Sequence, residues 1–213
     1  MRNNKICSLY SKFRKRHGLP VKFWPNWCAE RKDKRLREII AIGAILTQRT
    51  SWRNADLALE NLQRENLLSL EKISKLKDLE KLTSLIKPAG FYQTKPKRLK
   101  TLASFIIDNY GNILNFKKEE LTIARKKLLS LYGIGPETAD TILLYALDKP
   151  AFIIDEYTKR LVKKEKLAKV FDYDFLKSLF GKNLPKDFRI YRDFHALIII
   201  DLKGEQGSVM KRF

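Results

Sequence analysis

Apolar residues recur at helical spacing through most of the chain. Between residues 36 and 46 they follow one another at steps of three and four, which places them on one face of a helix: Leu36, Ile39, Ile40, Gly43 and Leu46. Similar stripes cover residues 98–109, 121–131, 161–179 and 191–202. Strict alternation is almost absent, and nine Gly and seven Pro are too few for a loop-rich all-β design. The pattern predicts an all-α chain.

The chain carries a large positive charge, because 44 Lys and Arg against 24 Asp and Glu give a net charge of +20. Such an excess favours a polyanionic partner, nucleic acid before an anionic membrane surface. General solubility or a heat-adapted host also produces basic chains. The longest apolar runs, such as 39–46, are less than half a membrane span, so we expect no membrane segment.

Cysteine usage excludes several kinds of site. Cys7 and Cys28 are the only cysteines, which rules out a disulfide framework, a zinc ribbon and a four-cysteine iron–sulfur cluster. The basic residues 14–16 adjoin no apolar segment, so we expect no secretory signal. These features favour a cytoplasmic protein, associated with the nucleoid in a prokaryote.

The most informative stretch joins two predicted helices near residue 131. Gly133 and Gly135 bracket Ile134, and Pro136 stands where the second helix begins, a position that needs no N–H. Without Cβ atoms, the turn can bring its backbone amides against a phosphate, beside the positive end of a helix. The alternative is a plain αα-corner, since Gly-x-Gly alone is weak evidence.

The string 131–140 resembles the helix-hairpin-helix motif of the endonuclease III superfamily of DNA glycosylases. Blocks 46–50, 90–95 and 153–157 match that superfamily in order and spacing. Residues 23–26, Phe-Trp-Pro-Asn, and the glutamate at 137 look most like the bacterial 3-methyladenine DNA glycosylases of this superfamily. The resemblance implies a two-lobed all-α fold: a helical barrel over 29–149 with the hairpin at about 124–147, and a second lobe from 1–28 plus 150–213.

Two departures from the superfamily pattern carry chemical consequences. Bifunctional members have a lysine in the second hairpin helix that forms a Schiff base, but this chain has Glu137, which cannot form an imine. The four-cysteine cluster is also missing. The carbamylated lysine associated with the site in the 3-methyladenine subgroup corresponds here to Leu197. We therefore expect a monofunctional enzyme without cofactor or bound metal at the site; the resemblance allows a monovalent cation on the hairpin carbonyls.

Asp155 is the catalytic candidate. From local sequence it could simply cap a helix, but the resemblance places the superfamily's catalytic aspartate in this block. A cap and a catalyst are compatible, because a helix N-terminus keeps a carboxylate ionised. Such a carboxylate stabilises the oxocarbenium-like sugar that forms when a base is cleaved, and can orient or deprotonate the attacking water.

Other site residues follow from the resemblance. Gln48 and Phe91 are candidate wedges that help flip a nucleotide, with an exposed polar helix end and a buried Phe as their alternatives. Further DNA contacts are expected from Gly133, Ile134, Gly135, Thr138 and Lys95. The expected base pocket consists of Phe23, Trp24, Pro25 and Trp52, although each could instead belong to the core. His195 is more typical of a core hydrogen bond than of a catalyst.

The sequence thus predicts a monomeric DNA glycosylase that hydrolyses the N-glycosidic bond of a damaged base, an N3-alkylated purine, in double-stranded DNA. A cationic alkylated purine leaves without a protonating acid, and no such acid is evident. Two alternatives stay open: a related glycosylase for a deaminated or oxidised base, and a non-catalytic helix-hairpin-helix module that only binds DNA.

Overall fold

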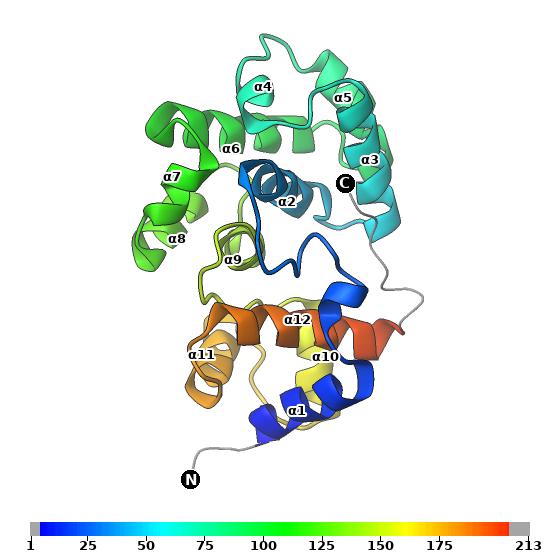
Figure 1. Ribbon diagram of the computed structural model, residues 1–213, viewed down its shortest axis with the longest axis vertical. Coiled ribbons are helices and arrows are strands. Elements are labelled where there is room, and N and C mark those ends of the chain that lie inside the picture. Colours follow the sequence, from blue (N-terminus) through cyan, green and yellow to red (C-terminus); the bar gives the residue numbers. More distant parts are fainter. Residues whose placement is uncertain (1–4, 205–213) are drawn as a thin grey trace.

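The computed structural model describes residues 5–204, which form helices and turns without a β-strand, as predicted (Figure 1). One end of the molecule holds α2 (Lys34–Leu46), α3 (Trp52–Arg64), α4 (Leu70–Ser74), α5 (Glu80–Ile86), η2 (Lys87–Ala89), α6 (Lys95–Tyr110), α7 (Ile113–Lys118), α8 (Leu121–Leu129) and α9 (Pro136–Thr141). The other end holds α1 (Lys5–His17), η1 (Pro20–Lys22), α10 (Glu156–Lys164), α11 (Tyr173–Asn183) and α12 (Phe188–Lys203). None of these helices is long and apolar enough to cross a membrane.

Each group is built around one buried helix. In the first group α2 is buried from Arg37 to Leu46 and packs against α3, α6, α7 and α9. In the second, α12 is buried from Tyr191 to Ile200 and packs against α1 and α10. The expected lobes, 29–149 and 1–28 plus 150–213, stay a prediction; residues 1–4 and 205–213 of the second lobe lie outside the described residues.

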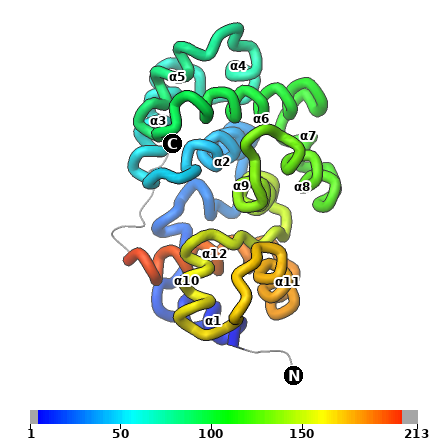
Figure 2. Tube along the Cα trace, turned by 180° about the vertical axis from the view of Figure 1, so that it is seen from behind, coloured from blue at the N-terminus to red at the C-terminus, as the bar shows by residue number. Residues whose placement is uncertain are grey.

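The segment after α9 lies between the two groups (Figure 2). Residues Ile142–Ala146 (η3) form a π-helix, and they contact both α2 and α12. The amide of Leu147 donates to the carbonyl of Ile142 at 3.1 Å, which widens the last turn of the hairpin's second helix. Tyr145 and its neighbours in this segment are thereby held at the junction of the groups.

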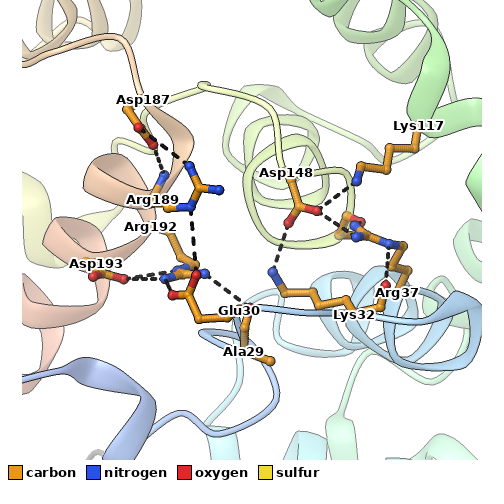
Figure 3. Close-up of polar contacts among 11 residues, drawn as sticks. Ala29, Glu30, Lys32, Arg37, Lys117, Asp148, Asp187, Arg189, Arg192 and Asp193 are labelled. Carbon is orange, nitrogen blue, oxygen red and sulfur yellow. Dashed lines mark hydrogen bonds and ion pairs between the residues drawn. The ribbon is translucent and has the colours of Figure 1, made fainter.

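A polar network fixes the chain between α1 and α2 against both groups (Figure 3). Asp148 accepts from Lys32 Nζ at 2.9 Å and forms ion pairs with Arg37 at 2.6 Å and Lys117 at 3.1 Å. On the other side, Arg192 of α12 binds Glu30 at 2.6 Å. Because Glu30 and Lys32 are two residues apart, this short segment bridges the end of η3 and α12.

Candidate active site

A pocket of about 170 Å³ opens where the two groups of helices meet. It is lined by aromatic rings, three threonines, three acidic residues, one histidine and two isoleucines: Trp24, Trp27, Thr47, Thr50, Trp52, Glu137, Thr141, Tyr145, Ile153, Asp155, Glu156, Tyr157, His195 and Ile199. These residues come from both ends of the chain, from the hairpin and from α12, so only the folded protein assembles the pocket.

Asp155 lies in this pocket and also caps α10. Its Oδ1 accepts from the amide of Thr158 at 2.7 Å, so the capping role suggested by the local sequence is confirmed. Its Oδ2 lies 3.5 Å from Nε2 of His195. Burial raises the pKa of the Asp155 carboxyl, but His195 and the hydrogen bonds from Thr158 outweigh burial and bring the pKa below its ordinary value. The carboxyl is therefore ionised at neutral pH.

Aromatic rings form one wall of the pocket. The rings of Trp24 and Trp52 lie 5.3 Å apart, and Trp27 packs edge-on against Trp52 at 5.1 Å and Tyr145 at 5.2 Å. Two of the predicted pocket residues, Trp24 and Trp52, thus line the cavity.

The residues on either side of Trp24 do not line the pocket. Phe23 and Pro25, also predicted, are half-buried but are not among the lining residues, because adjacent positions in the turn after η1 point in different directions. Trp27 and Tyr145 line the pocket although the sequence interpretation passed over both. The spacing of Trp24 and Trp27, three residues apart, was the available clue for one of them.

Glu137 occupies the hairpin position where bifunctional relatives are expected to carry lysine, and it faces the pocket. Burial and the nearby Asp155 charge raise the pKa of Glu137. The described residues that line the cavity include no lysine. An imine-forming amine is therefore not part of this wall.

The hairpin turn is tied to the end of α2. Gln48 donates from Nε2 to the carbonyl of Gly133 at 3.1 Å and to Thr138 Oγ1 at 2.9 Å, while Arg98 donates to Gln48 Oε1 at 2.5 Å. Gly133 has φ of 75°, and a Cβ there would meet Arg98 at 2.4 Å, so glycine is required on two grounds. A Cβ on Gly135 would meet nothing within 4 Å.

The other residues that were predicted to contact DNA differ in how exposed they are. Ile134 is buried and Thr138 nearly so, which leaves the backbone of this turn as its accessible part. Phe91 is 51% exposed with φ of 48°, so the alternative of a buried ring is excluded. Gln48 is half-buried with its amide engaged, and its role as a wedge stays a prediction.

The prediction for Lys95 is wrong. Its side chain is fully buried, and Nζ donates to the carbonyls of Leu46 and Ala89, both at 2.7 Å. An ammonium held in this way cannot reach a phosphate. Its place after the Phe91 turn, at the start of α6, directs it inward against the end of α2 instead.

An all-helical fold with a helix-hairpin-helix and an ionised aspartate in an aromatic pocket is the arrangement of a helix-hairpin-helix DNA glycosylase. The model for "HhH-GPD superfamily base excision DNA repair protein" matches residues 42–185. The chain therefore belongs to the HhH-GPD superfamily and is a base excision repair DNA glycosylase of that family.

Individual relatives agree with this assignment. A Methanocaldococcus jannaschii protein provisionally named as a DNA repair glycosylase is 49% identical over 166 residues, 75% of this chain and 74% of its own. Endonuclease III of Thermotoga maritima is 28% identical over 148 residues, 70% of this chain and 65% of its own.

Solved structures share the fold. The H. pylori 3-methyladenine DNA glycosylase bound to 1,N6-ethenoadenine is similar with a TM-score of 0.77 and 28% identity, over 92% of this chain and 96% of that one. The 8-oxoguanine DNA glycosylase of Thermotoga maritima has a TM-score of 0.69 at 15% identity, over 97% and 100% of the two chains, a likeness of fold alone.

Proposed function

We propose that this protein is a monofunctional glycosylase that removes a cationic N3-alkylated purine from duplex DNA by hydrolysis, leaving an abasic site. The observation that carries the proposal is the ionised Asp155 at an aromatic pocket whose described lining contains no lysine. The pocket would receive the flipped nucleotide, and the backbone of the hairpin turn would hold a phosphate beside it.

The chemistry needs charge stabilisation more than acid catalysis. As the bond between C1′ and the base nitrogen breaks, the electron pair leaves with the base and positive charge builds on the sugar. Asp155 would stabilise that charge and contact the water that attacks C1′. An N3-alkylated adenine is already cationic and departs as a neutral molecule, so no protonating acid and no cofactor enter the proposed reaction.

A cationic base also suits the walls of the pocket. Electron-rich rings such as Trp24, Trp52 and Tyr145 attract a cation by about 0.5–2 kcal/mol each when they face it. The carboxyl groups of Glu137 and Asp155 add negative potential. The similarity to a 3-methyladenine DNA glycosylase supports the same substrate class.

A cation on the hairpin has no part in the proposal. The carbonyl of Gly133 already accepts from Gln48 at 3.1 Å, and the carbonyl of Leu131 accepts from the Ile134 amide at 3.2 Å. Each carbonyl oxygen has a second lone pair, so the monovalent cation that the resemblance allows stays a prediction.

The substrate is tested with a panel of duplexes. One is methylated with dimethyl sulfate, and the others carry a single uracil, a G·T mismatch or 8-oxoguanine. Released bases are separated by chromatography, and abasic sites are counted after alkali cleavage. We expect release of 3-methyladenine. Release only of uracil, thymine or 8-oxoguanine would contradict the substrate class, and binding without release from any duplex would favour a module that only binds DNA.

A further inference from the structure

His195 is buried beside Asp155 with one ring nitrogen that makes no hydrogen bond among the described residues. The side chain is 5% exposed, and its Nε2 has no hydrogen-bond partner among the described residues. That nitrogen lies 3.5 Å from Asp155 Oδ2, and both residues line the pocket. Leaving a buried polar atom unsatisfied destabilises the fold, so a buried nitrogen directed at a cavity indicates something that binds there.

The opposite side of the ring is fixed. Nδ1 of His195 lies 2.8 Å from the Tyr145 hydroxyl, which also lies 3.4 Å from the carbonyl of Arg192. Burial raises the pKa of Tyr145 well above its ordinary value, so the phenol keeps its proton. When the hydroxyl donates to the Arg192 carbonyl and accepts from Nδ1–H, the lone pair of Nε2 faces the pocket.

We propose that His195 is a catalytic residue, whose Nε2 accepts the proton of the water that attacks C1′ while Asp155 remains ionised. The inference rests on the proposed function. It assigns stabilisation of the positive sugar to Asp155 and acceptance of the water proton to His195, two tasks that one aspartate would otherwise combine. In the step, the water oxygen bonds to C1′, the bond to the base breaks with its electron pair on the base, and one water proton passes to Nε2. The resulting imidazolium returns the proton to solvent after the products leave.

The geometry and the charges favour this division. Two atoms 3.5 Å apart can both contact one water at about 2.8 Å, a normal hydrogen-bond length. Oδ1 of Asp155 is already bound to the Thr158 amide, which leaves Oδ2 toward the water. An aspartate carboxylate stabilises positive charge well but is a weak base, whereas a neutral imidazole is the stronger proton acceptor.

His195 must be neutral to act in this way, and several charged and titratable groups lie around it. Asp155 and Glu156 line the pocket with it from the start of α10, Glu137 from α9 and Tyr145 from η3, while Arg192 and Asp193 lie on α12 itself. Protonation would remove the acceptor and offset the charge of Asp155. The rate of base excision should therefore fall as the pH is lowered.

The test is the single-turnover rate of 3-methyladenine release from dimethyl sulfate-treated duplex, with enzyme in excess, between pH 5 and pH 9. His195→Asn keeps a donor toward Tyr145 but lacks Nε2. We expect the maximal rate of this variant to be lower by about 100-fold or more. We also expect it to lose the acidic limb, which is the decline of the rate toward low pH. The chain has only two histidines, so His17→Asn is the matched control and should keep both rate and limb, since His17 binds Asp201 and neither residue lines the pocket.

The variant His195→Ala gives a second readout. Added imidazole should restore part of its rate, which a purely structural role would not allow, and duplex binding and thermal melting report folding. The proposal is overturned if His195→Asn keeps the wild-type rate and limb, if imidazole fails to rescue a folded His195→Ala, or if the limb disappears in Glu137→Gln instead. An inert wild type would contradict the proposed function itself. Loss in Asp155→Asn with an unaffected His195→Asn would contradict this inference alone.

Discussion

The side-chain amide of Gln48 donates to the carbonyl of Gly133, 85 residues away along the chain, at 3.1 Å. This bond joins the C-terminal end of α2 to the turn of the hairpin. A predicted wedge and a predicted phosphate site are thus held in one arrangement before any DNA is present. Movement of Gln48 into a duplex would have to break this bond and the one to Thr138.

Replacing Gln48 with Ala should therefore weaken both stability and DNA binding. The variant loses three hydrogen bonds of a half-buried side chain, for which we expect a loss of about 1–3 kcal/mol in the free energy of unfolding. Urea unfolding and duplex binding measure the two effects. Gln63→Ala, at an exposed position of α3, should change neither, and equal behaviour of the two variants would refute the link.

Lys95 predicts an unusual dependence of stability on pH. Burial, with a further contribution from Arg98, lowers the pKa of Lys95 to about 8, below its ordinary value of 10.5. The unfolded chain then binds more protons than the folded one between these values, so Lys95 contributes increasing stability as the pH rises from about 8 to 10.5. A neutral amine retains two N–H groups for Leu46 and Ala89.

The comparison is with Lys95→Met, which leaves both carbonyls unpaired. At pH 7 the variant should be less stable by about 1–3 kcal/mol. The difference in unfolding free energy should widen toward pH 10, because the other groups titrate alike in both proteins. A difference that stays constant or narrows would mean that Lys95 keeps its charge through this range.

Glu137 determines whether an imine can form. With wild-type protein and a substrate duplex, borohydride should trap no covalent complex, since a carboxylate cannot form the imine that borohydride reduces. Glu137→Lys places an amine in the pocket beside Asp155 and should yield a trapped complex visible on a denaturing gel. Glu80→Lys makes the same charge change on exposed α5 and should yield none. Strong trapping by the wild type would show that another lysine is the nucleophile.

Local sequence patterns predicted the parts of this structure that short-range chemistry decides. Pro136 begins the second hairpin helix and Asp155 caps α10, because the missing N–H of proline and the carboxylate of aspartate each suit one position at a helix start. The apolar stripe from Leu36 to Leu46 correctly predicted a helix, but α2 is buried on all sides from Arg37 to Leu46 and not along one face. The π-helix at 142–146 was not predicted, since its residues read as an ordinary apolar stripe.

The sequence did not predict the features that depend on tertiary packing. Lysine is normally exposed, so nothing in the pattern indicated that Lys95 would donate hydrogen bonds to two carbonyls in the interior. Trp27, Tyr145 and His195 meet in one pocket only because α12 crosses η3 beside the turn after η1. Which face of each element points inward there depends on contacts between segments more than a hundred residues apart.

The central claim is that the negative charge of Asp155 drives base excision. Asn is also a good helix cap, so Asp155→Asn removes the charge while keeping α10 intact, and Asp172→Asn makes the same change at the cap of α11. The most direct measurement is the single-turnover release of 3-methyladenine by both variants, with duplex binding measured alongside. The account predicts a loss of about 100-fold or more in Asp155→Asn, with binding retained and Asp172→Asn unaffected. Release by Asp155→Asn at the wild-type rate would contradict it.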